Sequence, residues 1–82
     1  MTDQPVQAGH LVWFTPHKDD PMFHPDILQK LTATVAYVHN PRVVNLNVLD
    51  QNGMSHARGS VLLLNEGDPQ PSPDECMFAV RQ

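Results

Sequence analysis

The residues best suited to chemistry lie in one short segment, HKDDPMFH, at residues 17–24. It combines the imidazoles of His17 and His24 with the carboxylates of Asp19 and Asp20, side chains that commonly bind divalent metal ions. Other histidines could add a ligand: His10, His39 and His56. The spacing matches neither a zinc motif nor a calcium-binding loop. We therefore expect a solvated polar loop, with no metal site and no cofactor.

The chain offers no convincing catalytic arrangement. Ser55 and His56 are the residue types of a nucleophile and its base, but neighbours in a strand point to opposite faces and should not meet. The glycines stand too far apart for a phosphate-binding loop. Cys76 is the only cysteine, so no second thiol could resolve an oxidised form. We expect a protein that is not an enzyme.

Length, charge and cysteine content limit the remaining classes. The chain has 82 residues, a net charge of -4 and five Lys and Arg, which predicts one small domain and disfavours nucleic acid as a partner. A single cysteine allows no intramolecular disulfide and indicates a reducing compartment. The first ten residues do not resemble a signal peptide. No apolar run approaches the ~20 residues that cross a bilayer, so we expect an intracellular protein.

Alternating apolar residues predict a small β protein. In the first apolar run, GHLVWFT, we expect Val12 and Phe14 to point inward, with Trp13 partly exposed as a cover or as a partner contact. In the second run, the same alternation places Tyr37 on one face with Ala33 and Val35. The predicted strands cover residues 9–15, 31–39, 43–49, 56–64 and 77–80.

The connections between these runs favour a particular architecture. Residues 16–30 form a long proline-containing loop, in which residues 25–29 could add one helical turn. The DQNG sequence at residues 50–53 predicts a tight turn, and residues 65–75 form a proline-rich break. We predict an all-β, five-stranded SH3-like barrel over residues 9–82, preceded by a flexible arm at residues 1–8. An OB-type barrel is the alternative.

Several short motifs resemble those of a group of small SH3-like proteins from tailed bacteriophages and prophages. The chain carries GHLVWF, LTATVAYVH, VVNLNVLDQNG and HARGSVLLLNEGD, so the resemblance spans about residues 9–80. It departs from the group at residues 77–80, where the group has a Trp. The resemblance implies an SH3-like fold and a phage origin, with location in the host cytoplasm or the virion. Most members of the group have no assigned activity.

These observations predict a bacteriophage protein that acts through protein-protein contacts. The first interpretation is a minor virion component of the capsid, neck or tail; the second is an inhibitor of a host defence or regulatory protein, which would use acidic loops as a decoy. Nucleic-acid binding is a weaker alternative, and a homo-oligomer stays open. The candidate contact residues, each equally compatible with packing, are Trp13, His17, Asp19, Asp20, Phe23, His24 and Tyr37.

Overall fold

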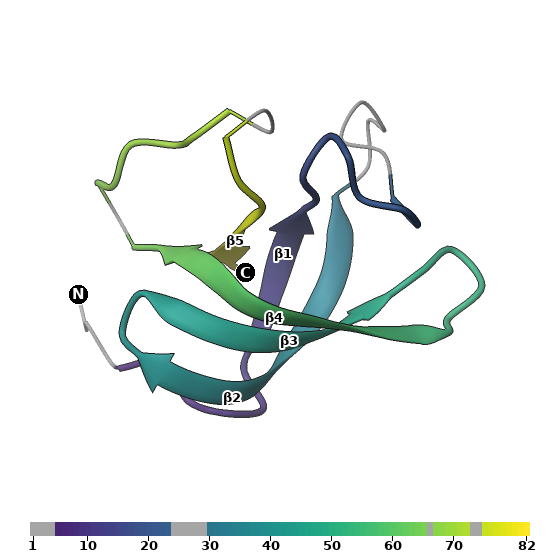
Figure 1. The fold of residues 1–82 in the computed structure, drawn as a ribbon. Helices are drawn as coiled ribbons and strands as arrows, with labels where there is room; N and C mark the ends of the chain where they lie inside the picture. The colour runs from purple at the N-terminus through teal and green to yellow at the C-terminus, as the bar shows by residue number, and fades with distance from the viewer. Residues whose placement is uncertain (1–4, 24–29, 66, 73–74) are drawn as a thin grey trace.

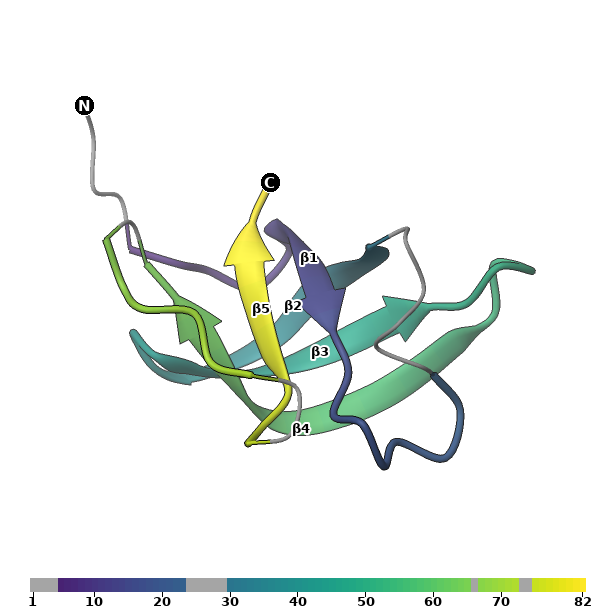
Figure 2. The same ribbon diagram turned by 90° about the horizontal axis from the view of Figure 1, so that it is seen from above.

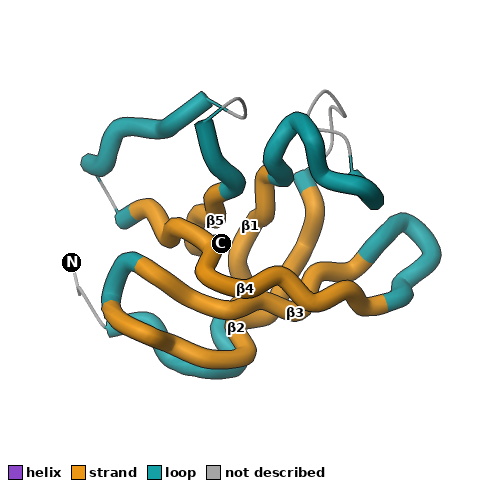
Figure 3. The backbone as a smooth tube through the Cα atoms, viewed as in Figure 1, coloured by secondary structure: helices purple, strands orange, loops and turns teal. Residues whose placement is uncertain are grey.

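Five β-strands form a closed barrel in which each strand pairs with its neighbours in the chain and the last returns to the first. The computed structural model describes residues 5–23, 30–65, 67–72 and 75–82, and all regular structure in these residues is strand (Figure 3). The strands, labelled in Figure 1, are β1 (Leu11–Thr15), β2 (Leu31–Asn40), β3 (Val43–Leu49), β4 (Ser55–Leu64) and β5 (Phe78–Arg81). This confirms the predicted small five-stranded SH3-like barrel, with strand ends within two residues of those expected.

The barrel interior is built from alternate residues of each strand. Val12 and Phe14 of β1 are 0% and 1% exposed, as predicted, and the apolar positions of β3 face the same core. Burying alternate side chains leaves the polar ones between them on the outer surface. Burial of apolar area is the main favourable term in folding such a small domain. The core residues that β3 and β4 contribute are Val44, Leu46, Val48, Val61 and Leu63.

One residue of β2 departs from the predicted alternation. Tyr37 was expected to share a face with Ala33 and Val35, but its side chain is 58% exposed. The β2–β3 register shifts between Val35 and Tyr37, and a bulge of this kind inserts one extra residue, which reverses the facing of the residues after it. Val38 therefore packs against the core instead. The prediction that Tyr37 shares a face with Ala33 and Val35 is wrong for this reason.

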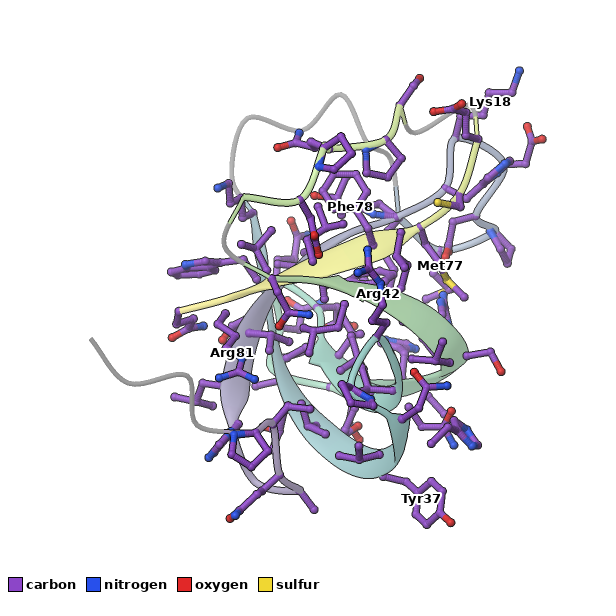
Figure 4. The ribbon with its side chains drawn as sticks, turned by 90° about the vertical axis from the view of Figure 1, so that its left-hand side faces the viewer. Lys18, Tyr37, Arg42, Met77, Phe78 and Arg81 are labelled. Atoms are coloured by element: carbon purple, nitrogen blue, oxygen red, sulfur yellow. The ribbon has the colours of Figure 1, made fainter. Side chains whose placement is uncertain are left out.

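The connection between β4 and β5 crosses over the outside of the barrel. β5 pairs antiparallel with β1 and parallel with β4; parallel neighbours require a crossover connection. Leu63 and Ala79 face the core, so the adjacent Leu64 and Phe78 point outward, yet they are 6% and 2% exposed. Phe78 lies on the side of β5 that faces the crossover (Figure 4). The crossover thus covers a small second apolar layer outside the barrel.

The packed domain begins before Gly9. Val6 lies within the predicted arm at residues 1–8, but its side chain is 5% exposed and belongs to the core cluster. A turn follows it, in which the His10 backbone N–H donates to the Gln7 carbonyl at 3.1 Å and Gly9 has a φ of 95°. Residues 1–4, His24 and the predicted helical turn at residues 25–29 lie outside the described part of the structure. In the described ranges, no helix has the length and apolar character needed to span a bilayer.

Candidate functional site

The outer face of β5, β1 and β2 carries two exposed apolar side chains. Trp13 is 37% exposed and lies between Val80 of β5 and Thr32 of β2, its direct partners in the sheet. Leu11, two residues earlier on the same face, is 55% exposed and lies opposite Thr34. None of these five residues is charged. We call them the Trp13 surface. β1 lies between β5 and β2 in the barrel, and Figure 2 shows β1 beside β5.

The long β1–β2 loop is fastened to the barrel by Asp20. Its carboxylate accepts backbone N–H groups of Met22 at 2.9 Å and Phe23 at 3.2 Å. The same carboxylate binds the Nε and Nη2 of Arg58 on β4, both at 2.8 Å, a two-pronged geometry that only a guanidinium provides. Burial by itself would raise the pKa of Asp20, but the Arg58 guanidinium and the backbone donors outweigh it and hold that pKa below its usual value.

Phe23 closes the end of the barrel beneath this loop. Its ring packs edge-to-face against the rings of Phe14 and His56, with ring centroids 6.3 and 5.4 Å away. The Arg58 guanidinium lies 5.2 Å from the centre of the Phe23 ring, within the range of a cation–π contact. His56 and Arg58 pair in register with buried residues of β3, so they occupy inward positions. Phe23 is 4% exposed and cannot contact a partner while the loop is closed.

Asp50 holds the turn between β3 and β4, next to this cluster. One carboxylate oxygen accepts the backbone N–H groups of Asn52 and Met54, at 2.8 and 2.9 Å. The other lies 2.9 Å from His56 Nε2. The hydrogen bond from His56, followed by the one from Met54, lowers the pKa of Asp50. Asp20 and Asp50 therefore fasten two neighbouring loops through carboxylates that favour the ionised form.

The lowered pKa values predict a loss of stability in acid. A carboxylate whose pKa is lower in the folded than in the unfolded state stabilises the fold above the unfolded value, about 3.9 for Asp. That stabilisation disappears as the pH falls through the lower, folded-state pKa. We expect the free energy of unfolding, measured by urea titration, to fall below about pH 4. The double variant Asp20→Asn, Asp50→Asn should show a shallower acid slope; an unchanged slope would contradict this assignment.

Among the described residues, the candidate contact residues do not form one surface. Tyr37 lies five residues along β2 from Thr32, a separation of about 16 Å along a strand, so it is remote from Trp13. His17 Nδ1 accepts the Asp19 backbone N–H at 3.0 Å within the loop, and the Asp19 side chain is 76% exposed. Asp20 and Phe23 serve packing, as described above. In the part of the chain described, no three His, Cys, Asp or Glu side chains gather as metal ligands would.

Sequence reasoning missed the inward-facing polar residues of β4. Val61 and Leu63 are the core residues of this strand, so a strict period of two would place His56 and Arg58 on the outer face. The β3–β4 register shift between Val44 and Leu46 turns both of them inward. Polar residues at such positions indicate a partner that covers them. The alternation of residues in β4 did not reveal this shift, and it did not reveal the partners, Asp20 and Phe23.

The acidic loops carry less free negative charge than their composition indicates. The β1–β2 loop and the crossover both extend from the same side of the barrel (Figure 1). However, Asp20 binds Arg58, and Asp68 binds Arg42 Nη2 at 3.3 Å as well as the Asn65 backbone N–H at 2.8 Å. These pairs neutralise part of the charge that a decoy surface would need.

A separate polar contact stabilises the irregular part of β4. Ser60 has a φ of 54°, a left-handed conformation that is unfavourable for a residue with a side chain. Asn45 Oδ1 accepts the Ser60 backbone N–H at 2.8 Å and lies 2.9 Å from His39 Nε2. The Asn45 side chain thus satisfies the backbone at the point where the β3–β4 register shifts.

Asn45→Ala is expected to lower the free energy of unfolding by about 1–2 kcal/mol, because the Ser60 N–H loses its acceptor. Asn47→Ala is the matched control: Asn47 lies on the same strand, is exposed and makes no side-chain hydrogen bond to the described residues. It should change the free energy by less than about 0.5 kcal/mol. Urea titration of both variants measures the difference, and equal effects would argue against the role given to Asn45.

Comparison with known proteins places the chain in no family. No protein-family model matches the sequence, no curated protein is significantly similar to it, and no solved structure significantly matches its fold.

Proposed function

We propose that this protein is a minor bacteriophage virion component that acts through protein-protein contacts, using the Trp13 surface. The observation that carries the proposal is the exposure of Trp13 and Leu11, two residues apart on the outer face of β1. Partly exposed tryptophan on a rigid support is a common centre of protein interfaces, because it buries a large area with little loss of conformational freedom. The phage origin rests on the resemblance of the strand motifs.

Charge favours this interpretation over the alternatives. The Trp13 surface has no charged residue, so it suits an apolar patch on a larger subunit rather than a phosphate backbone. An inhibitor that uses acidic loops as a decoy would need clustered free carboxylates, whereas Asp20 and Asp68 are each paired with an arginine. The inhibitor of a host protein is therefore the second proposal, and the experiment below separates the two.

The decisive experiment is quantitative mass spectrometry of gradient-purified virions from the phage or induced prophage that encodes the chain. We expect a fixed ratio to a capsid, neck or tail protein. Trp13→Ala should reduce incorporation at least about tenfold, while Tyr37→Ala, which removes an exposed aromatic elsewhere, should leave it unchanged. Circular dichroism should confirm that both variants are folded. Absence from clean particles together with abundance in infected cells would overturn the virion proposal and favour the inhibitor.

A further inference from the structure

The turn between β3 and β4 contains the only asparagine that is followed by glycine, Asn52–Gly53. Both residues are exposed at the tip of the hairpin. The Gly53 backbone N–H donates to the Asp50 carbonyl at 2.9 Å, and the Asp50 N–H donates to the Met54 carbonyl at 2.9 Å. Together with the two bonds to the Asp50 carboxylate, these contacts fix the backbone on both sides of Asn52.

In an Asn–Gly pair, the asparagine side chain can react with the backbone nitrogen of the glycine. The Gly53 amide nitrogen attacks the Asn52 side-chain carbonyl carbon, and a new C–N bond forms while the side-chain nitrogen leaves as ammonia with the Gly53 amide proton. Water then opens the resulting succinimide at either carbonyl, to give aspartate or isoaspartate at position 52. The sum is one water consumed and one ammonia released, so no oxidant or reductant is needed. Glycine favours the attack because it has no side chain to hinder its nitrogen.

We infer that Asn52 is a site of spontaneous deamidation and that Asp50 controls its rate in the folded protein. The N–H of the attacking nitrogen is bonded to the Asp50 carbonyl, so the proton that the attack must remove is already engaged. The Asp50 carboxylate holds the Asn52 N–H as well. Reaction requires the turn to open locally, so the rate in the native state follows the fraction of molecules with an open turn.

The reaction would alter the hairpin rather than a remote surface. Conversion adds a negative charge beside Asp50, and the isoaspartate product also inserts one carbon into the backbone between two strands whose pairing the turn sets. The sequence provides internal controls. Asn40 precedes a proline, and Asn45 and Asn47 precede bulky residues within β3.

The test is peptide mapping by mass spectrometry of protein incubated at mildly alkaline pH, folded in buffer or unfolded in concentrated urea. We expect conversion at Asn52 ahead of the other asparagines, and at least about tenfold faster in urea than in the native state. Asp50→Ala should remove most of that difference by accelerating the reaction in buffer, with circular dichroism as the check on folding. Gly53→Ala should slow the reaction in urea, where no turn exists.

Equal rates in buffer and in urea would overturn the inference, as would conversion at another asparagine before Asn52. A folded Asp50→Ala variant that reacts as slowly as the unmodified chain would equally overturn the role of Asp50. If that variant does not fold, hydrogen exchange of the Gly53 amide in the unmodified protein replaces it. Protection from exchange by about the same factor as protection from deamidation is the expected result, and an unprotected Gly53 amide would contradict the mechanism.

Discussion

Replacing Phe23 by alanine is expected to lower the free energy of unfolding by about 3–4 kcal/mol. The ring is 4% exposed and contacts Phe14 and His56 edge-on, with the Arg58 guanidinium over its face. Its removal leaves a cavity at the end of the barrel. The loop that contains Phe23 has three prolines, which restrict its backbone and hinder it from collapsing into that cavity. Urea titration at neutral pH measures the change.

The neighbouring Met22 provides a matched control, since it lies in the same loop but is 53% exposed. Met22→Ala should cost less than about 0.5 kcal/mol. A domain of this size has only a few kcal/mol of net stability, so Phe23→Ala should be partly unfolded at ambient temperature. If the two variants behaved alike, Phe23 would not be part of the core.

Replacing Arg58 by alanine is expected to have the second largest effect, a loss of about 2–4 kcal/mol. The Asp20 side chain is 5% exposed, so its carboxylate would remain largely buried without the guanidinium that compensates its charge. The contact of Arg58 with the Phe23 ring would be lost as well. Amide hydrogen exchange should show faster exchange of the Met22 and Phe23 N–H groups, which Asp20 holds in the unmodified protein.

The ion pair of Arg42 with Asp68 is the control for this prediction. It spans 3.3 Å, and the Arg42 side chain is 56% exposed, so solvent screens the interaction. Arg42→Ala should therefore cost less than about 1 kcal/mol. Arg58→Lys should not restore the stability lost in Arg58→Ala in full, because an ammonium cannot bind both carboxylate oxygens as a fork. Equal losses for the Arg42 and Arg58 variants would refute the role assigned to Asp20.

The β1–β2 loop is packed against the barrel through Asp20 and Phe23. Asp20 and Phe23 secure it at two adjacent points, one polar and one apolar, on the inward-facing residues of β4. Because Phe23 contacts both His56 and Arg58, the effects of Phe23→Ala and Arg58→Ala should not add. Among the described residues of this loop, a partner could reach the outward-facing side chains, such as Met22 and Asp19, but not the two that fasten it.

Local patterns in the sequence were sufficient to predict the strands and most of the core. Alternation at Val12 and Phe14, and at Val44, Leu46 and Val48, is a property of neighbouring residues, and a strand buried on one face always displays it. The DQNG turn was predictable for the same reason, since the backbone N–H groups that Asp50 accepts within it come from residues two to four positions away. The closed five-stranded barrel followed from the number of strands and the loops between them.

The candidate site depended on contacts between residues far apart in the chain. Asp20 and Arg58 are separated by 38 positions, so nothing near either residue indicates that the two meet. The bulge that turns Tyr37 outward is likewise set by the pairing of β2 with β3, and the burial of Phe78 by a crossover from β4. A period of two records only which side of a strand a residue takes, whereas burial depends on what the folded chain places over that side.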